Sequence, residues 1–307
     1  MNPLRGIVLK LCSVAVFMTM ASLIKAASDA VPPGEAVFFR SAFAVPVIVI
    51  WLIATKSLRA GLATGNPLGH FWRGLVGTAA MGFGFAGLGL LPLPEVTAIG
   101  YAAPLLTVIF AAMFLGEQVR AFRILAVALG MVGVLVVLSP RLTAVSTGDI
   151  GAEEALGAIV VLVGAVFAAL AQVFVRRLVT EERTTAIVFY FSVNSALLSL
   201  VTLPFGWTWP DPASAAMLVA AGFLGGVGQV LLTSSYRHAD ASVVAPFEYA
   251  SMLLALAVGY AVFGEVPTWT VLGGAALVVA AGILIIWRES RLGLERNRQR
   301  KAMTPQG

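Results

Sequence analysis

Long apolar runs alternate with short breaks of turn-forming or charged residues along the whole chain. Each run is close to the ~20 apolar residues with which a helix crosses a bilayer core, and in lipid the backbone polar groups must pair within their own segment, which favours helices. Pro46, Pro104 and Pro246 are expected to interrupt helical hydrogen bonding in the second, fourth and ninth runs. The pattern predicts ten membrane-spanning helices, or nine if the third and fourth fuse, at about 6–27, 34–55, 71–92, 94–115, 121–139, 156–177, 184–204, 214–236, 240–263 and 267–287.

Composition supports a membrane protein. Of the 307 residues, 59% are hydrophobic and only 11% are charged, whereas a soluble domain usually has about 25% charged residues. The single cysteine, Cys12, excludes a disulfide framework, and two distant histidines, His70 and His238, argue against a metal site built on histidine. We therefore expect an all-α polytopic membrane protein with no metal, no cofactor and no catalytic centre.

The basic residues predict the orientation of the chain. If the N-terminus lies in the cytoplasm and the spans alternate, 17 of the 20 basic residues fall on the inner side. The exceptions are Lys25 and Arg141 on the outer side and Arg40 within the second span. This positive-inside pattern predicts two cytoplasmic termini. It also accounts for the net charge of +5 without a nucleic-acid partner.

The two halves of the chain resemble each other. Phe114-Leu115-Gly116-Glu117 and Val262-Phe263-Gly264-Glu265 end the fourth and ninth spans, and the same offset of 148 aligns Tyr101 with Tyr249. Each half holds five spans, so the second half enters the membrane from the opposite side. Inverted repeats are typical of secondary transporters, whose substrate site lies near mid-membrane between the repeats; the alternative is chance similarity between apolar segments. The predicted units are a first repeat at 1–139, an outer linker at 140–155, a second repeat at 156–287 and a loosely ordered basic cytoplasmic tail at 288–307.

Several short motifs point to one family. Glu35-Ala36-Val37-Phe38-Phe39-Arg40 opens the second span, Arg73-Gly74 opens the third, and Pro94-Glu95-Val96-Thr97-Ala98 opens the fourth. With the two Gly-Glu ends, these motifs resemble the EamA-type carriers of the drug/metabolite transporter superfamily, over residues 5–287. The resemblance implies a ten-helix bundle around a central cavity that moves small metabolites or drugs.

Two N-terminal motifs narrow the resemblance. Met1-Asn2-Pro3-Leu4-Arg5-Gly6-Ile7 and Pro32-Pro33-Gly34-Glu35 are similar to riboflavin uptake carriers of alphaproteobacteria. The resemblance implies a secondary transporter of the bacterial inner membrane, with a small-molecule substrate and the lipid bilayer as partners, as a monomer or a homodimer. Transport of S-adenosylmethionine or an amino acid, or drug export, is the alternative. The remoter alternatives are an intramembrane enzyme and a scaffold that transports nothing.

Two charged residues inside spans are the first candidates for the substrate site, because ionisable groups are costly in a membrane. By the helical rise, Glu248 lies about 12 Å from the inner face and Arg40 about 9 Å from the outer face. We expect both to face the cavity and to hold substrate groups or each other. The alternatives are that Arg40 reaches back to the interface or braces neighbouring helices, and that Glu248 is a protonated or paired structural carboxyl.

Uncharged side chains complete the predicted site. Amides at depth can read the donors and acceptors of a heterocycle, although such groups also join helices by hydrogen bonds. Aromatic rings can stack on a flat substrate, and the repeat would place its two matched tyrosines on opposing cavity walls. These predicted binding residues are Gln172, Asn194, Gln229, Tyr101, Tyr249 and Phe39.

Overall fold

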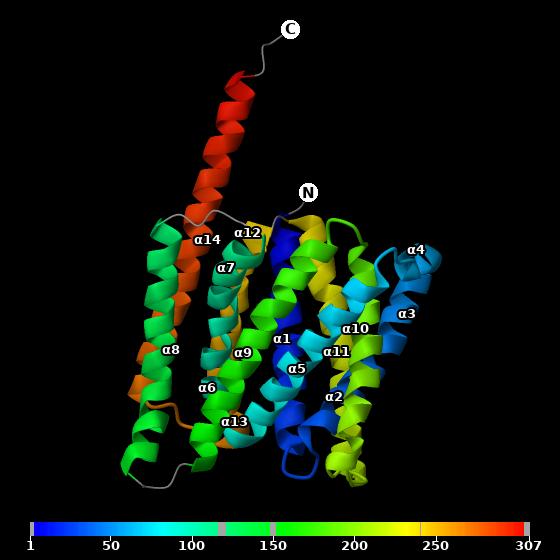
Figure 1. The fold of residues 1–307 in the computed structure, drawn as a ribbon, viewed down its shortest axis with the longest axis vertical. Helices are drawn as coiled ribbons and strands as arrows, with labels where there is room; N and C mark the ends of the chain where they lie inside the picture. The colour runs from blue at the N-terminus through cyan, green and yellow to red at the C-terminus, as the bar shows by residue number, and fades with distance from the viewer. Residues whose placement is uncertain (1–2, 116–120, 148–151, 240, 304–307) are drawn as a thin grey trace.

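The computed structural model describes residues 3–115, 121–147, 152–239 and 241–303. Within these ranges the chain is a bundle of helices without strands (Figure 1). This confirms the all-α fold. The elements are α1 (Pro3–Ala27), α2 (Pro33–Ala42), α3 (Ala44–Ala54), α4 (Leu58–Leu62), α5 (Pro67–Leu90), α6 (Leu93–Gly100), α7 (Ala102–Leu115), α8 (Ala121–Thr147), α9 (Ala152–Leu178), α10 (Thr184–Ser199), η1 (Leu200–Phe205), α11 (Pro212–His238), α12 (Ala241–Val244), η2 (Ala245–Tyr249), α13 (Ala250–Phe263) and α14 (Trp269–Met303).

The described helices are those of a polytopic membrane protein. Among the described residues, eight helical stretches are long and apolar enough to cross a membrane, and Ile124–Pro140 of α8 is a shorter apolar helix. The third predicted span, which corresponds to α5, is not among the eight. The count of ten crossings therefore stays a prediction. The eight stretches are Leu4–Ala27, Pro33–Ala54, Leu93–Phe114, Glu153–Leu178, Thr184–Phe205, Pro212–Ser235, Pro246–Phe263 and Trp269–Arg288.

Proline divides three of the predicted spans. A proline lacks the N–H that would bond four residues back, and its ring clashes with the carbonyl there. Accordingly α2 ends at Ala42, four residues before Pro46, and α6 ends at Gly100, four residues before Pro104. In the ninth span, Pro246 lies in the 3₁₀ turn η2. The predicted interruptions in these three spans are confirmed.

The packing of the helices has the symmetry that an inverted repeat requires. Helix α1 packs along α11, and α5 packs along α9. In the predicted repeat α1 corresponds to α9 and α5 to α11, so exchanging the halves converts one of these contacts into the other. The last helix of each half, α8 and α14, also pack against each other. The division into 1–139 and 156–287 stays a prediction, which this packing supports.

Helices extend into the predicted linker and through most of the predicted tail. Helix α8 continues through Pro140 to Thr147, and α9 begins at Ala152, so most of the linker 140–155 belongs to helices. The tail continues α14 as a helix to Met303 and projects beyond the bundle (Figure 1). The tail is therefore helical to Met303 where we expected loose order, and the bounds of the linker stay a prediction. Extending an existing helix requires no new nucleus, and the tail is rich in residues with good helix propensity, such as arginine and glutamate.

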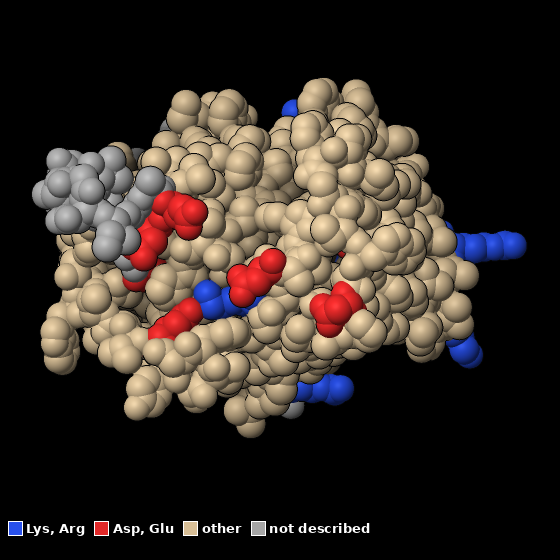
Figure 2. All heavy atoms as spheres, turned by 90° about the horizontal axis from the view of Figure 1, so that it is seen from below, with Lys and Arg blue, Asp and Glu red and all other residues tan. Residues whose placement is uncertain are grey.

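The two ends of the bundle differ in character. Helix α1 begins and α14 ends at the same end (Figure 1), as two termini on one side of a membrane require. Figure 2 shows the opposite end, where acidic side chains gather around a basic one. Asp29, Glu153, Asp211 and Glu265 belong to segments at this end, together with Lys25. Which end faces the cytoplasm stays a prediction from the basic residues.

Candidate functional site

Arg40 points into the bundle. It lies in the last turn of α2 and is only 5% exposed. Its guanidinium lies beside Gly225 of α11, where an added Cβ would stand 3.1 Å from Nε and 3.2 Å from Sδ of Met20 on α1. Its Nε and Nη1 are buried without a hydrogen-bond partner. Arg40 therefore does not reach back to the outer interface, which was the alternative reading.

A second arginine shares the same surroundings. Arg73 comes from α5, and its Cζ lies 3.6 Å from the centroid of the Phe191 ring of α10, whereas Cζ of Arg40 lies 5.8 Å from that centroid. Nε and Nη1 of Arg73 are also buried without a hydrogen-bond partner. Gly77 makes room for this arginine, because an added Cβ there would stand 2.5 Å from Nη1. Two cationic side chains from opposite ends of the bundle thus meet at one aromatic ring.

Glu248 forms an ion pair with Lys10 of α1, not with Arg40. The Lys10 side chain is 3% exposed, whereas that of Glu248 is 50% exposed. The carboxylate therefore neutralises a buried ammonium group and still presents part of its surface. The expected contact between Glu248 and Arg40 is not made, since each has other neighbours. An unpaired Glu248, which would favour a cationic substrate, is not observed.

The two tyrosines matched by the repeat touch each other. The rings of Tyr101 and Tyr249 are 5.1 Å apart between centroids, at 68°. Ser251 donates to the Glu248 carbonyl oxygen (2.7 Å), so the Tyr101 hydroxyl is the donor in its 2.6 Å hydrogen bond with Ser251 Oγ. Tyr249 also lines a cavity of about 440 Å³ with Met252 and other residues of α13 and α14. The repeat did bring these rings together, but edge to face and without a gap for a substrate ring.

The remaining predicted residues are in different settings. Asn194 donates to the His70 carbonyl oxygen (3.0 Å) and so joins α10 to α5, the helix-bracing role considered as its alternative. Phe39 stacks on Phe43, with ring centroids 5.8 Å apart. Gln172 is exposed on α9, and Gln229 is partly buried in α11. The structure brings these four residues into no common cluster, and their part in binding stays a prediction.

An ion pair joins the two halves at the acidic end of the molecule. Lys25 Nζ lies 3.0 Å from Glu265 Oε1 and donates to the carbonyl oxygens of Leu88 (3.0 Å) and Leu91 (2.7 Å). The other carboxylate oxygen of Glu265 accepts from the backbone N–H of Leu93 (2.8 Å). Gly264, in the left-handed conformation with φ +66°, ends α13 and turns Glu265 toward this contact. The second Gly-Glu end therefore supplies the carboxylate that joins the halves here; Glu117, of the first Gly-Glu end, lies outside the described residues.

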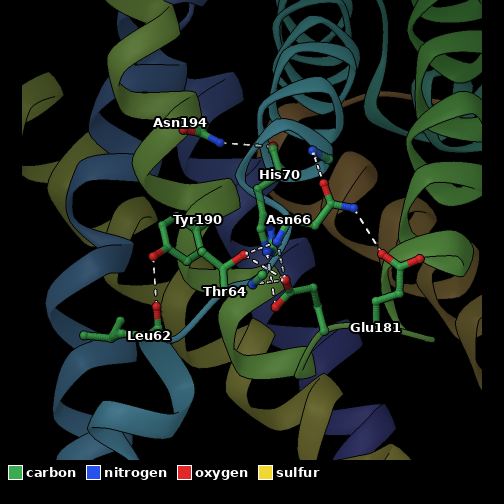
Figure 3. Close-up of polar contacts among 10 residues, drawn as sticks. Leu62, Thr64, Asn66, His70, Glu181, Tyr190 and Asn194 are labelled. Atoms are coloured by element: carbon green, nitrogen blue, oxygen red, sulfur yellow. Dashed lines mark hydrogen bonds and ion pairs between the residues drawn. The ribbon is translucent and has the colours of Figure 1, made fainter.

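A second polar cluster joins the halves at the opposite end (Figure 3). Oε1 of Glu182 accepts from Thr64 Oγ1 (2.8 Å), Gly65 N (2.7 Å) and Asn66 N (2.8 Å). Nε2 of His70 lies 3.7 Å from the other carboxylate oxygen. Burial alone would raise the pKa of Glu182, but the three hydrogen bonds and the neighbouring His70 outweigh this and lower it below its ordinary value.

The same cluster includes a ring contact and two further hydrogen bonds. The rings of His70 and Tyr190 lie 4.8 Å apart between centroids, and the Tyr190 hydroxyl donates to the Leu62 carbonyl oxygen (2.8 Å). Asn66 Nδ2 donates to Glu181 (3.1 Å). The loop before α5 is thereby attached to the turn before α10. Figure 3 shows these side chains pointing toward one another from α5, α10 and the segments that precede them.

The sequence reasoning missed three of these groups. Lys10 was counted only as a basic residue of the inner side, Arg73 only as such a residue and as part of the motif that opens the third span, and Glu182 was not considered. The available signal was position, because Lys10 lies inside an apolar run and Arg73 lies six residues into α5. Among the described residues, no group of three histidine, cysteine or acidic side chains is placed to hold a metal ion.

The comparisons with known proteins match this architecture. The model of the EamA-like transporter family matches residues 4–139 and 155–287, and that of solute carrier family 35 matches residues 97–205. A solved crystal structure is similar with a TM-score of 0.64 at 22% identity, covering 91% of this chain and 96% of that chain. This last likeness concerns the fold alone.

The similar curated proteins are transporters with different substrates in their names. The pseudopaline exporter of Pseudomonas aeruginosa is 30% identical over 91% of this chain and 95% of its own. An S-adenosylmethionine uptake transporter of Rickettsia bellii is 26% identical over 84% of each chain. A riboflavin transporter of Rhizobium johnstonii is 28% identical over 85% of this chain and 83% of its own. The family model covers most of both halves, so the chain belongs to the EamA-like transporter family, within the drug/metabolite transporter superfamily.

Proposed function

We propose that this member of a membrane transporter family is a secondary carrier of the bacterial inner membrane, with both termini in the cytoplasm. It moves a small metabolite by alternating access, in which one central site opens to each side in turn. The observation that carries this proposal is the family match over both halves, together with the polar contacts that join the halves at each end. Lys25 with Glu265 and Thr64 with Glu182 are contacts that would break and re-form as the halves move.

Riboflavin is the substrate that we propose to test first. The resemblance of the N-terminal motifs to riboflavin carriers supports this choice, as does the similarity to the Rhizobium johnstonii protein. The interior also offers aromatic surface, with Tyr101 against Tyr249 and Phe39 against Phe43. The tyrosine rings would have to separate to hold an isoalloxazine ring, which fits a site that forms during the transport cycle.

Growth rescue tests this substrate. The gene is expressed in a bacterial host that cannot make riboflavin and lacks its own riboflavin carrier. We expect growth at a low external riboflavin concentration, and uptake of labelled riboflavin that an excess of unlabelled riboflavin suppresses. Absence of both, with verified insertion of the protein in the membrane, would exclude riboflavin and leave the other metabolites to be tested by the same uptake assay.

A further inference from the structure

Arg40 is a buried cation and Arg73 is a partly buried one, and neither has a counter-ion among the described residues. Among the described residues, Nε and Nη1 of both side chains are buried without a hydrogen-bond partner, and both guanidiniums lie near the ring of Phe191. A buried charge is normally paired, because moving an ion out of water is expensive. A cation–π contact offsets only part of this cost. Two like charges at one ring add their mutual repulsion, so the arrangement calls for an anion.

The location of the pair fits a substrate site. Arg40 lies seven residues, or about 10 Å, from the start of α2, and Arg73 lies six residues, or about 9 Å, from the start of α5. The two helices begin at opposite ends of the bundle. In a core of ~30 Å, two long side chains reaching inward from these levels meet near the middle. Their common neighbour Phe191 comes from the second half, so the pair lies where the halves meet.

The chemistry of the pair selects the ligand. A guanidinium presents a planar fork of N–H donors that matches a carboxylate or phosphate group, often with two parallel hydrogen bonds. The unbonded Nε and Nη1 atoms of both arginines are donors of this kind. Gly77 and Gly225 leave room beside the two heads, since a Cβ at either position would crowd them.

We propose that Arg40 and Arg73 form an oxyanion-binding subsite beside Phe191, which takes a carboxylate or phosphate group of the transported metabolite. The inference rests on the proposed carrier function and adds a substrate class to it. Riboflavin is uncharged at neutral pH, so its phosphate ester, flavin mononucleotide, is expected to bind more tightly than riboflavin itself.

Thermal unfolding of the purified full-length protein in detergent tests the subsite without knowledge of the substrate. Melting temperatures are measured at pH 7 in potassium phosphate, acetate and chloride at equal ionic strength. For each protein, the shift is the melting temperature in phosphate or acetate minus that in chloride. We expect this shift to be about 2–4 °C larger for the wild type than for R40Q or R73Q. The variants correct for the general stabilising effect of phosphate. R59Q, at an exposed arginine, is the matched control and keeps the wild-type response.

Matched ligand pairs separate the two oxyanions. Flavin mononucleotide against riboflavin tests phosphate, and S-adenosylmethionine against its decarboxylated form tests carboxylate. We expect the wild type to bind the anionic member of at least one pair about tenfold more tightly, and R40Q and R73Q to lose this preference. R40K and R73K keep the charge without the planar fork, so they should keep part of the preference.

The contrary results are equally defined. If R40Q and R73Q respond to oxyanions as the wild type does, and the wild type prefers neither anionic ligand, the arginines only brace the helices and the proposal is wrong. The wild-type ligand comparison decides even if the glutamine variants do not fold. Loss of riboflavin uptake with an intact oxyanion response would reject riboflavin alone. Riboflavin uptake without any oxyanion response would reject the subsite alone.

Discussion

Glu182 is the residue whose replacement best tests the contact between the halves at the end opposite Lys25. One oxygen of its carboxylate accepts three hydrogen bonds from the loop before α5, at 2.7–2.8 Å, and its side chain is 4% exposed. The substitution Glu182→Gln keeps the shape and one acceptor oxygen, but it removes the negative charge. The three donors then bond to a neutral amide oxygen.

The structure allows the size of this effect to be worked out. A hydrogen bond to a charged group contributes about 1.5–3 kcal/mol, and a charge-assisted bond is roughly twice as strong as a neutral one. The N–H of Gly65 belongs to an exposed residue, so the lower end of the range applies. Losing about half of each of three bonds then amounts to about 2 kcal/mol. In a chain of 307 residues, with an unfolding entropy of about 0.6 kcal/mol/K, this lowers the melting temperature by about 3 °C.

The assay is thermal unfolding of the purified protein in detergent at pH 7, with Glu181→Gln as the control. Glu181 is the adjacent exposed carboxylate and accepts a 3.1 Å hydrogen bond from Asn66 Nδ2. We expect the control to stay within about 1 °C of the wild type, as surface substitutions usually do. Equal melting temperatures for the two variants would refute the reasoning, because the contact at Glu182 would then contribute no more than an exposed side chain.

Three further predictions follow from the same geometry. The pKa of Glu182 is lower in the folded protein than in the unfolded chain. The charged carboxylate therefore stabilises the fold above the unfolded pKa of ~4.3, and this stabilisation is lost as the pH falls through the folded pKa. The difference in melting temperature between wild type and E182Q should be steady from pH 7 to about 5 and shrink below about pH 4. Glu248→Gln removes the counter-ion of the buried Lys10, and we expect uptake at matched expression to fall about tenfold, equivalent to ~1.4 kcal/mol. A wild-type Km and rate would show that this carboxylate does not belong to the substrate site. Tyr101→Phe loses one hydrogen bond to Ser251, so the melting temperature should fall by about 1–2 °C for a loss of about 1 kcal/mol, and uptake should stay within about twofold of wild type. A much larger loss of uptake would place the hydroxyl at the substrate.

The sequence alone predicts most of the fold, because the bilayer leaves the chain few alternatives. The apolar runs predict helices, and the prolines at 46 and 104 predict where helices break, since the missing N–H acts on a fixed residue four positions back. The polar tail is the exception. Its polarity was taken as a sign of loose order, although residues 288–303 continue α14 as a helix, because polar residues with good helix propensity extend a helix outside the membrane.

The candidate site is less predictable, because a charge in a span does not reveal its partner. Arg40 is buried in the bundle, but Glu248, which was expected to hold substrate groups or Arg40, pairs with Lys10. Whether Arg73 stays near the interface or reaches Phe191 depends on a rotamer and on the space that Gly77 leaves. The internal repeat was a better guide to contacts than the charges were, because it matched Tyr101 with Tyr249, and these two rings are in contact. Contacts between halves depend on tertiary packing, which the local pattern does not encode.

Counterflow in proteoliposomes tests the central claim most directly. Vesicles that contain the purified protein are loaded with unlabelled riboflavin, flavin mononucleotide or S-adenosylmethionine, then diluted into a trace of the same compound in labelled form. A carrier with one site that opens to each side in turn predicts transient accumulation of label above its equilibrium level for at least one compound, and a weaker overshoot for E248Q. Label that never rises above equilibrium with any of the three, while empty and loaded vesicles behave alike, would contradict alternating-access transport of these metabolites.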